Sequence, residues 1–379
     1  MYTVLNYGEM AADSVRMDAY ARAIARAVKP GCVVVDIGAG TGIFSLLAAR
    51  AGARQVHAVE PNPAVWVLAD VAREAGLSER IVVHHRTSYE LELPEKADVI
   101  VSDLRGSVPL HEEHLAALRD ARARLLAPGG VLLPARDELF VAAVESEPIA
   151  RSLARGARGF ERRGFAAESI HRSVLNSPIR DGGEISASHV VSTAAAWATV
   201  VYGESSGPFE GEVELRARRG GTIHALALWF AATIFEDLGF TTEPGTASVY
   251  SRLLLPVQEP VDVEPGDRIR VIVRADETGQ RWAWETAFTT ASGETRSRQR
   301  QSTFFGMPTS PEALLRSSSS FAPERSIRGE RVRQALELMD GARSVAEIAS
   351  AIAASPNAAN VPRDVILDEV RDLVARYGR

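Results

Sequence analysis

The sequence predicts an α/β protein in which a parallel sheet is followed by an antiparallel β-barrel and a small α-helical or winged-helix domain. In residues 1–134, apolar runs of strand length alternate with helical segments, which is typical of βαβ units. After about residue 135, β-rich runs are separated by Gly, Pro and acidic turns, the pattern of an antiparallel barrel or sandwich. A Ser/Pro-rich stretch then precedes three short helical segments.

The composition sets limits on the class of protein. A chain of 379 residues exceeds one ordinary core, so two or three domains are expected. Its formal net charge of −6 argues against nucleic-acid binding, because neutralising phosphates needs clustered Lys and Arg. The single cysteine, Cys32, excludes a disulfide framework and a cysteine metal cage, and we predict no metal site. Because neither a signal peptide nor a membrane-spanning apolar run is found, we expect a cytoplasmic protein that does not bind membranes.

The first predicted domain, residues 1–134, opens with a helix over 10–28, where apolar residues recur at helical spacing. The segments that follow are predicted, in order, as strand 32–38, helix 41–52, strand 55–60, helix 65–76, strand IVVHH, strand 97–103, helix 112–126 and strand 127–134. This alternation predicts right-handed crossovers and a parallel sheet.

The second predicted domain, residues 135–307, is the barrel. Its β-rich runs are ELFVAAVE, HVVSTAAAWATVVY, EGEVELRARR, TIHALALWFAATIF, RIRVIVRAD and WAWETAF. Between the first two lies an arm, about 146–187, that is rich in Arg and Ser and has little apolar periodicity. Residues 308–327 are predicted as a Ser/Pro linker, and residues 328–379 as a small helical domain with a stop at Gly341 and Pro362 in a first helical turn.

The segment DIGAGTG, residues 36–42, follows a predicted strand and opens a helix. Its glycine loop therefore lies at the carboxyl edge of a parallel sheet, where ligands bind in open α/β folds. The third glycine of a dinucleotide fingerprint is replaced by Ile43, and no Gly-Lys-Ser/Thr is present to grip phosphates. The loop instead carries its own acid, Asp36.

A loop without phosphate-binding groups but with an acid suits a nucleoside that has a cationic centre, and S-adenosylmethionine (SAM) is such a cofactor. Glu60, about 20 residues further on at a strand end, is placed to accept hydrogen bonds from both ribose hydroxyls. Gly38 and Gly40 allow the backbone to approach the ligand closely. The alternative is a tight turn in any α/β protein, but Asp36, Glu60 and a later LLAPGG together favour a Rossmann-like SAM-binding sheet.

The segment SDLRGSVPLHEEH, residues 102–114, carries the candidate catalytic residues Asp103 and Glu112, nine positions apart. Two carboxylates suit a nitrogen acceptor, because they bind its cationic form, orient it and accept the released proton. The alternatives are a capping or turn role for Asp103 and a solvated first helical turn for Glu112. His111 and His114 flank Glu112 and are candidates for an assisting base.

These segments together resemble the protein arginine methyltransferase family. MAADSVRMDAY matches the family's M-x-x-D-x-x-R-x-x-x-Y segment, and SDLRGSVPLHEE occupies its double-glutamate loop at the same separation. VVVDIGAGTGIFSLLAARAGARQVHAVE matches its cofactor loop, while TIHALALWFAATIF and YSRLLLPVQEPVDVEPGDRI are similar to its barrel strands. The resemblance covers about residues 2–306 and implies a SAM-dependent N-methyltransferase. It also implies a homodimer, because in the family the inserted arm docks on a second subunit.

The resemblance assigns a role to each matching residue. Arg16 would pair with the carboxylate of the cofactor, and the alternative for this residue is a surface pair with Asp13. Glu60 would hold the ribose, while Ser88, by its backbone, and Tyr89 would lie beside the adenine. Asp103 and Glu112 would grip the substrate.

Three departures from the family weaken the case for a guanidinium acceptor more than the case for methyl transfer. The first carboxylate is Asp103, one methylene shorter than the family's glutamate. Arg105 adds a cation to a loop that should attract a cation. The family's Thr-His-Trp element aligns with Ser248–Val249–Tyr250, which lacks the histidine.

The C-terminal segment from residue 328 is similar to small domains related to PqqD, which bind leader peptides. A DNA-reading helix-turn-helix and a helical cap on the barrel are the alternatives, and the first of these lacks a basic face.

Three functions follow from these observations. The first is N-methylation of a basic nitrogen, guanidinium or amine, in a peptide or protein such as a ribosomally made natural-product precursor. The second is N-methylation of free arginine or a related small amine, in which Arg105 would bind the substrate's carboxylate. The third is a non-catalytic SAM-binding scaffold that recognises peptides.

Overall fold

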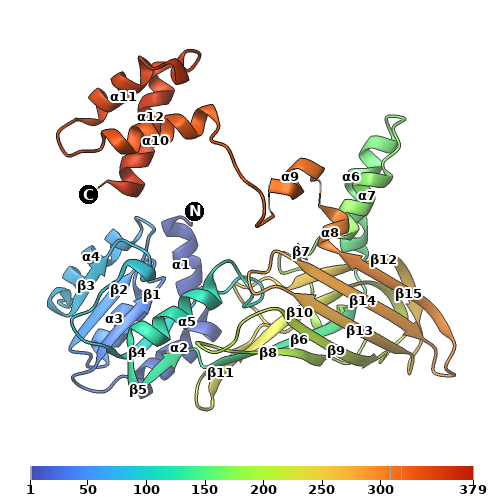
Figure 1. Cartoon of the computed structure of the whole chain (residues 1–379). Coiled ribbons are helices and arrows are strands. Elements are labelled where there is room, and N and C mark those ends of the chain that lie inside the picture. The colour runs from blue at the N-terminus through green and yellow to red at the C-terminus, as the bar shows by residue number, and fades with distance from the viewer. Residues whose placement is uncertain (1, 308, 317, 379) are drawn as a thin grey trace. The chain divides into compact units, whose positions relative to one another are not determined.

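The computed structural model describes residues 2–307, 309–316 and 318–378. The chain divides into two compact units, residues 1–307 and residues 308–379. The first contains a parallel sheet and two antiparallel sheets, and the second is built from helices (Figure 1). No helix within the described residues is both long and apolar enough to cross a membrane.

The parallel sheet contains five strands in the order β3-β2-β1-β4-β5. They are β1 (Val33–Ile37), β2 (Gln55–Val59), β3 (Ile81–His84), β4 (Ala97–Ser102) and β5 (Leu126–Leu133). Every neighbouring pair is parallel, which confirms the Rossmann-like prediction. All five residues of β1 are buried, as expected for the central strand of a sheet covered on both faces. The strand order reverses between β1 and β4, and such a switch point is where open α/β sheets bind ligands.

The helices of this region are α3 (Ile43–Arg50), α4 (Val65–Glu74) and α5 (His114–Arg124), with the short η1 (Ser78–Arg80) and η2 (Ser88–Glu90). The single helix predicted over 10–28 is wrong, because the chain forms α1 (Val4–Ala12) and α2 (Ser14–Ala27) instead. Asp13 separates the two helices with extended backbone, and its Oδ1 accepts the Arg16 N–H as the cap of α2. Its Oδ2 accepts the N–H of Val249, so Asp13 is not the surface partner of the Arg16 side chain.

The predicted barrel strands form two antiparallel sheets rather than one hydrogen-bonded barrel. The first sheet contains β6 (Arg136–Val144), β7 (Ile179–Arg180), β8 (Ala195–Val201), β10 (Gly221–Phe235), β11 (Leu238–Thr241) and β12 (Leu253–Val263). The second contains β9 (Phe209–Arg216), β13 (Arg268–Ala275), β14 (Trp282–Thr289) and β15 (Thr295–Ser302). The Trp284 indole donates to the Pro256 carbonyl and so links the two sheets, whose buried residues share one core with the parallel sheet.

The arm is a hairpin of two helices, α6 (Glu147–Glu161) and α7 (Glu168–Leu175), which projects from the antiparallel sheets (Figure 1). The expectation of little apolar periodicity is wrong, because Ile149, Leu153 and Ala157 are spaced four apart and are all buried. Phe160 and Phe165 at the turn of the hairpin remain 51% and 62% exposed. The short helices η3 (Ala187–His189) and α8 (Thr303–Gly306) complete this unit.

The second unit contains α9 (Pro311–Arg316), α10 (Ile327–Leu338), α11 (Val345–Ala353), η4 (Pro356–Ala358) and α12 (Arg363–Tyr377). The last three α-helices enclose a small core that includes Ala335, Ile352 and Val370. Residues 309–316 and 318–378 contain no strand, so the α-helical alternative holds and the winged-helix alternative is wrong. Pro362 caps α12 rather than lying in its first turn. The predicted linker carries α9, and its predicted first residue, 308, lies outside the described residues.

Candidate functional site

Three neighbouring strands of the parallel sheet end at one edge. Ile37 of β1 is in register with Val59 of β2 and with Ser102 of β4. The residues that follow them are Gly38, Glu60 and Asp103. The sheet register therefore brings together the predicted cofactor loop, the predicted ribose-binding acid and the first candidate catalytic residue.

The glycine loop adopts left-handed backbone, with φ 75° at Gly38 and 53° at Gly40. A Cβ atom at Gly38 would lie 2.2 Å from the Leu104 side chain, and one at Gly40 would lie 2.5 Å from the Tyr7 ring. The loop is held by the Gly38 N–H, which donates to the Val59 carbonyl at 2.9 Å. The left-handed backbone and these close contacts favour glycine at both positions, where the side chains of Leu104 and Tyr7 lie against the loop.

The carboxylate of Glu60 is fixed by two backbone groups. Its Oε2 accepts the N–H of Gly40 at 3.0 Å, and its Oε1 accepts the N–H of Asn62 at 2.7 Å. Burial raises the pKa of Glu60 despite these hydrogen bonds, which act in the opposite direction. Each carboxylate oxygen can accept a further hydrogen bond, so the orientation suits a pair of ribose hydroxyls.

Asp36 supplies an unpaired buried acceptor beneath the glycine loop. Its Oδ2 accepts the hydroxyl of Ser45 at 2.6 Å, whereas its Oδ1 is buried and has no hydrogen-bond partner among the described residues. Burial raises the pKa of Asp36 to about 7. A buried carboxylate oxygen without a protein partner can accept a hydrogen bond from a ligand, and the cationic amino group of SAM is a donor of the right charge. The residues present therefore fit the cofactor.

The predicted adenine-contacting residues lie in η2, four residues beyond β3. Ser88 is buried, and its carbonyl accepts a hydrogen bond from Arg124 Nη2 at 2.7 Å. Tyr89 is 44% exposed. Because β3 pairs with β2 up to His84 and Val59, this turn follows the same edge of the sheet as Glu60.

Asp103 is the centre of a buried ion-pair network. Arg16 Nε lies 2.5 Å from its Oδ2, Arg105 Nη1 lies 2.9 Å from its Oδ1, and the Tyr250 hydroxyl donates to it at 2.6 Å. Burial alone would raise the pKa of Asp103, but the two guanidinium groups and the hydroxyl outweigh it and lower the pKa to about 2. Asp103 is therefore ionised and fully engaged within the protein.

Glu112 has the opposite environment, with a side chain that is 74% exposed. The two candidate catalytic carboxylates are therefore not presented as a matched pair in this structure. The helix α5 begins at His114, so Glu112 lies in the loop before the helix. The alternative of a solvated first helical turn at Glu112 is therefore wrong. His114 is buried with Nδ1 3.3 Å from the Pro109 carbonyl, and burial lowers its pKa to about 3, which excludes it as an exposed assisting base.

The suggestion that Arg105 binds a substrate carboxylate is wrong, because its side chain has no exposed surface. Its guanidinium is paired with Asp137. This pair was not predicted from the sequence, and neither were the contacts of Tyr250 with Asp103 and of Tyr7 with the glycine loop. A signal for Asp137 was present in the sequence, since it is an acid at the start of an apolar strand.

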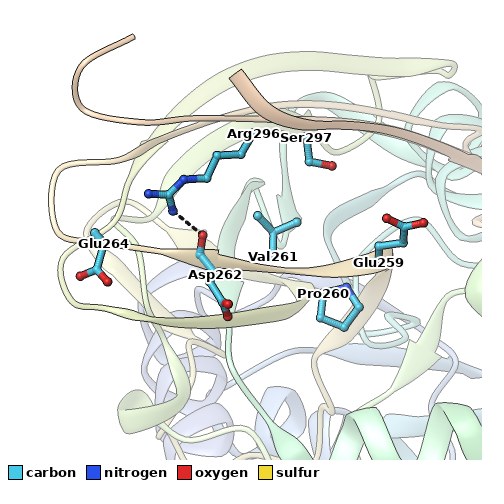
Figure 2. A pocket seen from close by; sticks show the side chains of 7 residues that line it. All are labelled: Glu259, Pro260, Val261, Asp262, Glu264, Arg296 and Ser297. Atoms are coloured by element: carbon cyan, nitrogen blue, oxygen red, sulfur yellow. Dashed lines mark hydrogen bonds between the residues drawn. The ribbon is translucent and has the colours of Figure 1, made fainter. Parts of the chain in front are cut away.

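A surface hollow of about 470 Å³ lies elsewhere, between β12 and β15 (Figure 2). Figure 2 shows Arg296 donating to the Asp262 carbonyl, beside the acids Glu259 and Glu264. None of the candidate site residues lines this hollow.

Comparison with known proteins agrees with the geometry at the sheet edge. Residues 34–130 match the family model described as a methyltransferase domain. Protein arginine N-methyltransferase 6 of Danio rerio is 32% identical over 270 residues, which cover 67% of this chain and 77% of that protein. The Xenopus tropicalis protein of the same name is 30% identical over 275 residues, which cover 69% and 80%.

Two solved structures share the fold. Arabidopsis thaliana protein arginine methyltransferase 10 has a TM-score of 0.69 at 20% identity, over 79% of this chain and 98% of that chain. A Trypanosoma brucei PRMT1 enzyme-prozyme complex with AdoHcy also has a TM-score of 0.69, at 22% identity, over 78% and 97%.

The sheet, its glycine loop and the domain match define a methyltransferase that uses SAM as its cofactor. The chain belongs to the protein arginine N-methyltransferase family.

Proposed function

We propose that this protein transfers the methyl group of SAM to a basic nitrogen of a peptide or protein, either an arginine guanidinium or an amine. The observation that carries the proposal is the exposed carboxylate of Glu112 in the loop that follows β4 and Asp103. Family membership favours arginine as the first acceptor to test.

The backbone of Glu112 supports a functional role. Its φ of 45° is left-handed, which is unusual for a residue other than glycine. Its N–H donates to the Thr278 carbonyl at 2.9 Å, and Gly279 approaches the Leu110 carbonyl too closely to carry a Cβ. Contacts from the antiparallel region thus hold the residue in a strained conformation, and such strain is concentrated at functional sites.

The proposed roles of the other residues follow from their contacts. When bound, SAM supplies an electrophilic methyl group. Asp36 and Glu60 would bind its amino group and ribose, and Arg16 Nη2 would bind its carboxylate, because Nε and Nη1 already donate to Asp103 and Met10. Glu112 would orient the acceptor nitrogen and stabilise its positive charge, and a carboxylate there can accept the released proton. Tyr7 would exclude water from the glycine loop.

We further propose a homodimer in which the arm docks on a second subunit. The exposed Phe160 and Phe165 at its end support this role, because aromatic anchors dominate protein interfaces. The helices α10–α12 are proposed to bind the peptide substrate, since they form a compact unit with its own core.

The function is tested by mass spectrometry after incubation with isotopically labelled SAM. The acceptors are an arginine-containing peptide, a lysine-containing peptide and free arginine. Methylation of a peptide by the full chain, with a reduced rate after removal of residues 308–379, is the expected result. Methylation of free arginine alone would contradict the peptide proposal.

A further inference from the structure

Arg105 is enclosed between two carboxylates. Its Nε and Nη2 donate to Asp137 Oδ2 and Oδ1 at 2.6 and 2.9 Å, the two parallel bonds of a bidentate pair. Its Nη1 donates to Asp103 at 2.9 Å and to the Tyr20 hydroxyl at 2.7 Å. Burial would lower the pKa of Arg105, but Asp137 raises it well above its usual value, so the guanidinium stays charged.

Three aromatic rings complete this enclosure. The Cζ atom of Arg105 lies 5.4 Å from the ring centroid of Tyr202, 5.3 Å from that of Phe230 and 5.9 Å from that of Phe240. Such distances allow cation–π attraction. Two carboxylates, a hydroxyl and three rings make up a receptor for a guanidinium, which we call the guanidinium chamber. Its members are Tyr20, Asp103, Asp137, Tyr202, Phe230 and Phe240.

The chamber shares Asp103 with the proposed cofactor site. One oxygen of Asp103 binds Arg105, the other binds Arg16, and the Tyr250 hydroxyl lies 2.6 Å from both. Withdrawal of Arg105 would leave Asp137 as a buried carboxylate without its cationic partner, which is strongly unfavourable. A substrate guanidinium would therefore have to compete with an arginine that the fold already holds.

We propose that Arg105 is a built-in occupant of the guanidinium chamber and determines the acceptor specificity of the enzyme. Arg105 keeps Asp103 from binding the acceptor, so that Glu112 is the one carboxylate of the pair that binds it. When Glu112 alone binds the acceptor, the site lacks the second carboxylate that would favour a guanidinium group. An arginine side chain then has no advantage over a primary amine as the methyl acceptor. This inference rests on the proposed function for its catalytic part, but the chamber itself can be tested by binding.

The binding test is chemical complementation of Arg105→Ala. The variant is expected to unfold at a lower temperature than the wild type, and 10 mM methylguanidinium chloride should raise its midpoint by several degrees without affecting the wild type. Methylammonium chloride at equal concentration controls for charge. Arg252→Ala is the matched control, because Arg252 is also buried but its side chain donates to the carbonyls of Thr242, Glu243 and Thr246. An equal rise of the unfolding midpoint in Arg252→Ala, or in Arg105→Ala with methylammonium, would show that the effect is not specific to a guanidinium in the chamber and would overturn the proposal.

The specificity test uses Arg105→Met combined with Asp137→Asn, which removes both charges of the pair and keeps an acceptor for Tyr202. If Arg105→Ala does not fold, this double variant still tests the role of Arg105 in acceptor specificity. The ratio of kcat/KM for an arginine peptide to that for a lysine peptide should rise at least tenfold over the wild-type ratio. SAM affinity should stay within twofold, because Arg16 keeps its contact with Asp103.

An unchanged ratio would overturn the specificity role of Arg105. If wild type and variant methylate neither peptide, the proposed function fails instead. The complementation experiment then still shows whether the chamber binds a guanidinium group.

Discussion

Arg16 and Asp103 form an ion pair between the first turn of α2 and the loop after β4, with Nε 2.5 Å from Oδ2. Both side chains are nearly enclosed, at 7% and 2% exposure. The pair joins the arginine proposed to bind the cofactor to an acid of the proposed acceptor loop. Tyr250 ties the antiparallel region to the same acid. The cofactor side and the acceptor side of the site are thus built on one shared carboxylate.

Replacement of Asp103 by Asn should destabilise the protein. The change leaves Arg16 and Arg105 short of negative charge in a buried position, and breaking such a pair costs about 3–5 kcal/mol. The free energy of unfolding in urea at pH 7 measures the loss. Glu112→Gln is the comparison, with an expected change within about 0.5 kcal/mol, because that side chain is exposed. Equal stability of the two variants would show that the ion-pair network is not structural.

Replacement of Glu112 by Gln should instead remove activity. Loss of the carboxylate that orients the acceptor and accepts its proton is expected to lower kcat/KM by about 100-fold or more, with unchanged SAM affinity. Turnover with labelled SAM and calorimetric titration measure the two quantities. Glu113→Gln is the matched control, since Glu113 is an exposed neighbour outside the proposed site. A Glu112→Gln variant with wild-type turnover would remove the basis of the proposed function.

Cofactor binding should release a proton from Asp36. Burial raises the pKa of its carboxyl to about 7, so about half of the molecules carry this proton at pH 7. A cationic amino group beside Oδ1 would stabilise the ionised form and expel up to about half a proton. Calorimetric titration with SAM in buffers of different ionisation enthalpy measures the release. Asp36→Asn should release about half a proton less than the wild type and bind SAM more weakly. If both proteins release the same number of protons, the amino group of SAM does not lie beside Asp36.

The parallel sheet could be predicted from the sequence because its signals are local. The bounds of β1, α3, β2 and α4 lie within two residues of the predicted ones, since apolar runs and glycine stops mark each element. β15 (Thr295–Ser302) was not predicted, because its sequence TRSRQRQS has no apolar residue. It is a strand at the edge of its sheet and is held by pairing with β14, a non-local interaction that composition does not reveal.

The candidate site also has one part that could be predicted from the sequence and one part that could not. The positions of Gly38, Glu60 and Asp103 at one edge follow from motifs and from the geometry of parallel strands. The two distant partners of Asp103 could not be predicted, because Arg16 is 87 positions away and Tyr250 is 147 positions away. Whether a charged side chain is buried beside another depends on the complete packing, which the spacing of residues along the chain does not determine.

Acid should destabilise the protein through His57 and His84. His57 Nδ1 lies 3.0 Å from His84 Nε2 across β2 and β3, and this contact cannot persist when both rings are protonated. Burial lowers the pKa of both, that of His84 to about 4. Their unfolded forms bind protons below about pH 6.5, so stability is complete above that pH and is lost as pH falls towards 4. Urea unfolding between pH 7 and pH 4 should show a shallower decline for His84→Gln; an unchanged decline would exclude the pair as its cause.

Dimerisation should depend on the two exposed phenylalanines of the arm. Phe160 lies in the last turn of α6 and Phe165 lies in the loop before α7, in the helical hairpin that projects from the antiparallel sheets (Figure 1). Replacing both by Ser should weaken the homodimer by about 2–4 kcal/mol, because buried aromatic anchors carry much of the energy of an interface. Sedimentation velocity over a range of concentrations measures the change, and the variant should become monomeric at concentrations where the wild type is dimeric. Phe321→Ser, at an exposed aromatic outside the arm, is the control and should leave the dimer intact. A wild-type monomer would contradict the homodimer, whereas a dimer that tolerates both changes would place the interface elsewhere on the chain.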